Sequence, residues 1–83
     1  MSQVFINMEK RMAKFAHVRA LILQEVHEEP GLTYEQIGDR IKRKHGFRPR
    51  IGNRIRELRT IGYVETKLEA DNLLHVYPTR GVS

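Results

Sequence analysis

The organisation of this chain follows from residues 33–62, which read TYEQIGDRIKRKHGFRPRIGNRIRELRTIG. Thr33 and Gln36 have the spacing of a capping box, in which each side chain satisfies a free backbone donor of the other residue. A helix is therefore predicted over residues 33–45, and Gly46 supplies the left-handed residue that commonly follows a helix. A very short connection then leads to a second helical pattern.

That second pattern predicts a helix over residues 49–61, with Pro49 in its first turn. At 100° per residue, its apolar residues fall on one side of the helix. They are Ile51, Ile55, Leu58 and Ile61. The stretch thus predicts two helices joined by a tight turn, each with one side turned to a core.

The flanking sequence adds a helix before this pair and a hairpin after it. Apolar residues at three- and four-residue steps predict a helix over residues 8–28, with Asn7 as its N-cap and residues 1–7 as an N-terminal arm. Alternating apolar and polar residues predict a β-hairpin over residues 63–77, followed by a tail over residues 78–83. A chain of 83 residues has room for one such α+β domain.

Two stretches resemble a known superfamily. Residues 28–38 (EEPGLTYEQIG) look like the end of the first helix and the start of the second in MarR-like and related bacterial or phage regulators. Residues 58–64 (LRTIGYV) look like the exit from the third helix into the wing. The resemblance is to winged helix-turn-helix domains, and it implies three helices, a two-stranded wing and double-stranded DNA as partner. Residues 42–48 are longer and more basic than the usual turn, and the wing tip carries the acidic Glu69 and Asp71.

The positive charge is confined to one quarter of the chain. Residues 39–59 carry nine basic and two acidic side chains, a formal charge of +7. The rest of the chain carries six basic and eight acidic side chains, a formal charge of −2. Such a local concentration is the electrostatic footprint expected of a nucleic-acid-binding surface.

The predicted DNA contacts lie on and beside the helix over residues 49–61. In helix-turn-helix proteins the N-terminal half of this helix enters the major groove. Base contacts are predicted for the residues turned away from the buried side, namely Arg50, Asn53 and Arg56. Phosphate contacts are predicted for Arg43, Lys44, Arg48 and Arg54. Lys67 is the single basic residue of the hairpin.

The sequence favours a small transcription regulator over an enzyme. It holds no Ser/His/Asp order, glycine-rich phosphate loop or paired acids, so no catalytic residue and no cofactor is predicted. The four histidines lack metal-ligand spacing, and there are no cysteines, so no metal site is predicted. The longest apolar run, residues 20–23, is far shorter than a membrane span, and no signal peptide is recognised. A cytoplasmic location is expected.

Alternative partners stay open at this point. Winged helices also serve as protein-interaction modules or phage-type inhibitors, and the acidic wing favours a protein partner. RNA is the least favoured partner, because aromatic residues are scarce on the basic surface. A homodimer is predicted through an apolar N-terminal group, which consists of Val4, Phe5, Ile6, Met8 and Met12.

Overall fold

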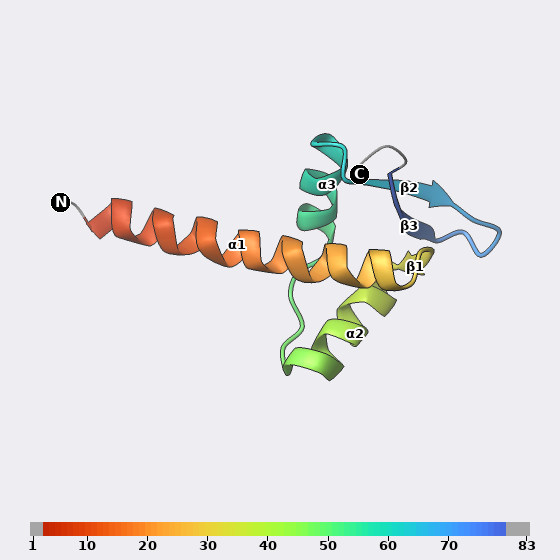
Figure 1. Ribbon diagram of the computed structural model, residues 1–83, viewed down its shortest axis with the longest axis horizontal. Coiled ribbons are helices and arrows are strands. Elements are labelled where there is room, and N and C mark those ends of the chain that lie inside the picture. Colours follow the sequence, from red (N-terminus) through yellow and green to blue (C-terminus); the bar gives the residue numbers. More distant parts are fainter. Residues whose placement is uncertain (1–2, 80–83) are drawn as a thin grey trace.

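The computed structural model describes residues 3–79, with side chains described over residues 15–79. The elements in chain order are α1 (Gln3–Glu28), β1 (Leu32–Thr33), α2 (Tyr34–His45), α3 (Gly52–Thr60), β2 (Val64–Leu68) and β3 (Leu74–Pro78). Helices α2 and α3 pack against the C-terminal half of α1, and the β2–β3 hairpin lies at one end of the domain (Figure 1). Three helices followed by a hairpin form an α+β domain consistent with the predicted winged-helix layout.

One hydrophobic core receives side chains from all six elements. Its members are Val18, Leu21, Ile22, Val26, Leu32, Ile37, Ile41, Ile51, Ile55, Leu58, Val64 and Val76. Full burial of one such side chain contributes about 1.5–3 kcal/mol. Ile55 and Leu58 are buried as predicted. The prediction for Ile61 was wrong: α3 ends at Thr60, and Ile61 is 60% exposed in the turn that follows.

The sheet contains a strand that the sequence pattern did not reveal. The two-residue β1 pairs antiparallel with β3, with Leu32 opposite Val76, so the strand order is β1-β3-β2. Two residues are too few to show an alternating pattern. Strands β2 and β3 form the predicted hairpin, with Leu68 opposite Leu74. Strand β3 continues to Pro78, and residues 80–83 of the predicted tail lie outside the described part of the chain.

Helix α1 begins at Gln3 rather than at residue 8. Asn7, predicted as the N-cap, therefore lies inside the helix, and most of the predicted arm over residues 1–7 is helical. No glycine or proline interrupts this stretch. Asparagine inside a helix costs at most about 0.7 kcal/mol, so nothing local forces the helix to begin at residue 7.

Helix α3 begins at Gly52 rather than at Pro49. Its N-cap is Ile51, which has helical backbone angles (φ −91°, ψ −44°), and the carbonyl of Ile51 accepts from the amide of Ile55 at 2.9 Å. Because Ile51 is also a core residue, burial fixes the chain at this point. Residues 47–50 therefore form a connection to α3 and are not part of its first turn.

Both ends of α2 confirm the sequence prediction. The hydroxyl of Thr33 accepts from the amide of Gln36 at 3.2 Å, and the Gln36 side chain accepts from the amide of Thr33 at 2.9 Å. At the other end, Gly46 adopts a left-handed conformation (φ 83°) and donates to the carbonyl of Lys42 at 2.8 Å. The capping box and the left-handed glycine both depend only on residues close together in the sequence.

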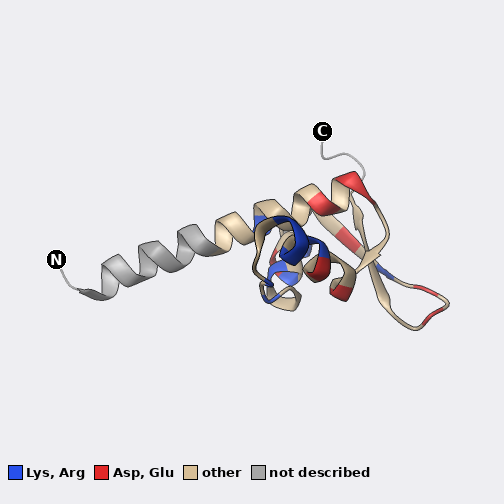
Figure 2. Ribbon diagram, turned by 90° about the horizontal axis from the view of Figure 1, so that it is seen from below, with Lys and Arg blue, Asp and Glu red and all other residues tan. Residues whose placement is uncertain are grey.

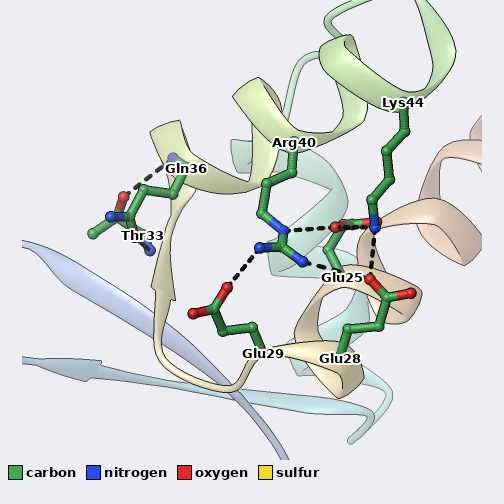
Figure 3. Close-up of polar contacts among 7 residues, drawn as sticks. All are labelled: Glu25, Glu28, Glu29, Thr33, Gln36, Arg40 and Lys44. Carbon is green, nitrogen blue, oxygen red and sulfur yellow. Dashed lines mark hydrogen bonds and ion pairs between the residues drawn. The ribbon is translucent and has the colours of Figure 1, made fainter.

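A buried carboxylate joins α1 to α2. Glu25 is 1% exposed, and its oxygens accept from Arg40 Nε at 2.7 Å and from Lys44 Nζ at 2.9 and 3.0 Å (Figure 3). Arg40 also donates to Glu29 at 2.6 Å, and Lys44 to Glu28 at 2.6 Å. Burial by itself raises the pKa of Glu25, but the bonds from Arg40 and Lys44 outweigh burial and hold that pKa below its ordinary value.

His75 joins the wing to the turn before β1. Its Nδ1 lies 2.6 Å from the carbonyl oxygen of Gly31, and its Nε2 lies 2.8 Å from a carboxylate oxygen of Asp71. Both partners are acceptors, so a protonated imidazole donates to both at once. The Gly31 carbonyl and the Asp71 carboxylate raise the pKa of His75 above its ordinary value of 6.5.

Replacing Glu25 by glutamine is expected to lower the free energy of unfolding by about 1.5–3 kcal/mol, the usual contribution of hydrogen bonds to charged groups. Urea unfolding at neutral pH measures this loss. Glu65→Gln is the matched control, because Glu65 is exposed and its contact with Lys67 is 3.7 Å long. The control should change stability by less than about 1 kcal/mol. Equal losses in the two variants would contradict a special role for Glu25.

Stability is expected to fall as the pH rises through the folded-state pKa of His75. That pKa is raised on folding, so the stabilisation is fully present below the unfolded pKa of about 6.5 and is lost above the folded one. Urea unfolding of the natural chain and of His75→Gln, from about pH 5.5 to 9, measures the effect. The variant should show a flatter dependence, and identical profiles would refute this assignment.

Candidate nucleic-acid interface

The three predicted base-contacting residues are exposed on α3 and just before it. Asn53 and Arg56 lie one helical turn apart, and Arg56 Nη2 donates to Asn53 Oδ1 at 3.4 Å. Arg50 precedes α3, because the helix begins at Gly52. The direction of the Arg50 side chain therefore depends on the backbone of residues 47–50. The prediction had placed Arg50 by helical periodicity, which does not apply before Gly52.

The predicted phosphate contacts at the end of α2 differ in how their charge is used. Lys44 is held by Glu25 and Glu28, so its positive charge already has two carboxylate partners. Arg43 is exposed, and within residues 15–79 no carboxylate lies within 4.0 Å of it. Neighbouring residues of α2 therefore offer different amounts of free charge to a ligand.

Arg48 packs back onto α2. Its guanidinium forms an ion pair with Asp39 and donates to the carbonyl of Glu35 at 3.3 Å. The same group lies above Gly38, where an added Cβ atom would be 3.2 Å from it. The space that a glycine opens on this face of α2 is thus occupied by an arginine side chain.

Arg54 is largely enclosed by protein. The carbon of its guanidinium lies 3.8 Å from the centre of the Phe15 ring, a cation–π contact, and its side chain is 12% exposed. Its Nε lies 3.0 Å from a Glu57 oxygen without hydrogen-bond alignment, and Arg19 donates to that same oxygen at 3.0 Å. Arg54 therefore contributes to the packing of α3 on α1.

Taken together, the basic residues of segment 39–59 fall into two groups. Four of them contact carboxylates, namely Arg40, Lys44, Arg48 and Arg54. The other five are exposed and have no such contact with residues 15–79: Lys42, Arg43, Arg50, Arg56 and Arg59. In the view of Figure 2, lysines and arginines lie in the middle of the domain with some acidic residues among them, and further acidic residues lie at the end of α1 and at the wing tip.

The wing offers little free positive charge. Lys67 Nζ lies 5.1 Å from the centre of the Tyr77 ring and 3.7 Å from a Glu65 oxygen. At the tip, Tyr77 donates its hydroxyl hydrogen to Glu69, and Asp71 binds the His75 ring. The acidic side chains of the tip are therefore partly engaged inside the wing.

The buried carboxylate that engages part of the basic segment was not predicted from the sequence. Glu25 follows Leu21 and Ile22 by four and three residues, which places it on the buried face of α1. A carboxylate on an apolar helix face needs a cation nearby, and α2 is rich in cations. The spacing of Glu25 from Leu21 and Ile22 could therefore have predicted a buried carboxylate from the sequence.

Neither metal chemistry nor a membrane span has support in the described residues. Among them, no group of three His, Cys, Asp or Glu side chains is arranged to hold a metal ion. No described helix combines the length and apolar character needed to cross a bilayer. Comparison of the chain with protein families, with curated proteins and with solved structures gave no match.

Proposed function

We propose that this chain is a double-stranded DNA-binding protein, a small transcription regulator of bacterial or phage type that places α3 in the major groove. It would act by occupying a duplex site and not by catalysis. The observation that carries the proposal is the group of five exposed basic side chains without a carboxylate contact among the described residues. They are Lys42, Arg43, Arg50, Arg56 and Arg59. Free cations attract a polyanion.

We assign the recognition of DNA bases to the start of α3. Asn53 and Arg56 are exposed there, and asparagine and arginine form bidentate pairs with adenine and guanine. Gly52 leaves room for a close approach of DNA, because, its chain neighbours and the backbone of its own helix apart, no described atom lies within 4 Å of the place where a Cβ would stand. The packing of the free protein therefore gives no reason for a glycine at this position. Arg50 joins this group from the connection before the helix.

Phosphate binding is assigned first to Arg43. Its guanidinium is exposed and has no described carboxylate partner. Lys44, Arg48 and Arg54 would have to share or give up contacts with carboxylates to reach a phosphate, so we expect each to contribute less than Arg43.

Duplex affinity is expected to depend strongly on salt. Contact with about five phosphates gives a slope of about −4.5 for log K against log salt concentration. Arg43→Ala should make the slope shallower by about 0.9 with little change in melting temperature. Lys67→Ala is the matched control, because Lys67 is an exposed cation outside the proposed surface. Fluorescence anisotropy with a labelled random duplex measures all three slopes. A slope near zero, or no duplex binding at low salt, would overturn the proposal.

A second candidate, a protein-interaction module, is favoured by the apolar wing tip. The hairpin face that carries the buried Val76 continues outward to the cross-strand pair Leu68 and Leu74, which are 67% and 41% exposed. Glu69 and Asp71 lie between these two leucines in the sequence, and both are engaged inside the wing. Such an exposed apolar pair suits an apolar segment of a partner protein. Absence of duplex binding would favour this candidate.

The homodimer remains a proposal that rests on sequence alone. The side chains of the apolar N-terminal group lie outside the described residues. Light scattering should show a dimer for the full chain and a monomer for a chain that begins at Lys14. A monomer in both cases, at micromolar concentration, would rule out this mode of association.

A further inference from the structure

A groove of about 390 Å³ opens between α1, residues 47–50 and the start of α3. Its volume lies within the range of small-ligand sites. The residues that matter for recognition line this one groove: Phe15, Phe47, Arg48, Arg50, Asn53 and Arg54. Among the residues with described side chains, its lining contains three arginines and no acidic residue. Its chemistry therefore favours a ligand that is both anionic and partly apolar.

The apolar part of the groove is aromatic. Phe47 comes from the connection before α3 and remains 38% exposed, although it is large and hydrophobic. Phe15 comes from α1, and the guanidinium of Arg54 already covers its ring at 3.8 Å. Of the two rings, Phe47 is thus the one without a described cation against it. Planar rings of this kind stack with planar apolar groups, nucleobases among them.

The polar part offers separate positions for an anion and for a hydrogen-bonding edge. Arg50 is exposed and has no carboxylate contact with the described residues. Arg48 also lines the groove, but its charge is already shared with Asp39, so Arg50 is the position for an anion. Asn53 presents an exposed amide, which both donates and accepts hydrogen bonds. A simple aromatic acid could stack on Phe47 and pair with Arg50, but the amide of Asn53 would have no hydrogen-bond partner on it.

We propose that this groove binds a nucleotide, with the base against Phe47, the base edge at Asn53 and the phosphate at Arg50. A nucleotide is the ligand class that combines a planar ring, a polar edge and an anion. Its source is either a free nucleotide or an unpaired nucleotide at the end of a DNA duplex. Because Arg50 and Asn53 also belong to the proposed duplex surface, a free nucleotide should compete with a duplex. Binding of the nucleotide itself does not depend on duplex binding.

The test is a titration of the isotope-labelled full chain followed by amide NMR. The probes are dAMP, deoxyadenosine without phosphate, and inorganic phosphate without base. We expect dAMP to shift amides of residues 47–54 and to bind at least about tenfold more tightly than either fragment. Arg50→Ala should remove the advantage of dAMP over deoxyadenosine.

Variants of Phe47 test the stacking contact. Phe47→Ala should weaken dAMP binding at least about fivefold, the lower end for loss of one base–aromatic stack, whereas Phe47→Tyr should retain binding. Leu73→Ala is the control, because it removes an exposed apolar side chain from the wing. Thermal melting verifies that each variant folds. Equal affinity for dAMP and phosphate, or unchanged dAMP affinity in a folded Phe47→Ala, would overturn the proposal.

Two further duplexes identify the source of the nucleotide. A blunt duplex is compared with the same duplex carrying one unpaired 3′ nucleotide. Tighter binding of the overhang by the natural chain, lost in Phe47→Ala, would assign the groove to DNA ends. Equal binding of both duplexes, with dAMP competing, would assign it to a free nucleotide. Binding of dAMP without any duplex binding would support the groove and refute the proposed function.

Discussion

The arrangement of α1 and α2 depends on the ion pairs that the buried carboxylate of Glu25 forms with Arg40 and Lys44. Glu25 is the one charged side chain among the buried residues of the described chain, and a buried charge without partners would be costly. Arg40 and Lys44 stand four residues apart on α2, so this side of α2 must face α1 for both to reach it. Hydrophobic burial of Ile37 and Ile41 stabilises the pair of helices but is not directional. The ion pairs add the directional restraint.

The same restraint changes the meaning of the charge pattern. Segment 39–59 has a formal charge of +7, which suggests a uniformly basic surface. In the folded chain, Arg40 and Lys44 lie within the Glu25 cluster, and Arg48 and Arg54 are engaged with Asp39 and Glu57. The attraction for a polyanion therefore falls on fewer side chains than the sequence implies.

Features set by neighbouring residues could be predicted from the sequence, and those set by distant contacts could not. The capping box at Thr33 and the left-handed Gly46 are local, so both ends of α2 were predicted. Strand β1 exists because Leu32 pairs with Val76, which lies far along the chain. The residues next to Leu32 in the sequence do not predict that pairing. Likewise, residues 47–50 form a connection before α3, although Pro49 is compatible with a first helical turn. The sequence identified the basic residues but not their partners, since Lys44 lies 19 positions from Glu25.

The wing shows how folding can account for residues that look functional. Asp71 binds His75 and the amide of Leu73, and Glu69 accepts from the hydroxyl of Tyr77, so both acids support the conformation of the hairpin. Their presence then says little about a partner, because the wing has its own use for them. The exposed leucines of the tip differ, since they contribute least to the core and expose apolar surface to water. The exposed leucines, and not the acidic charge, are therefore the feature of the wing that favours a protein partner.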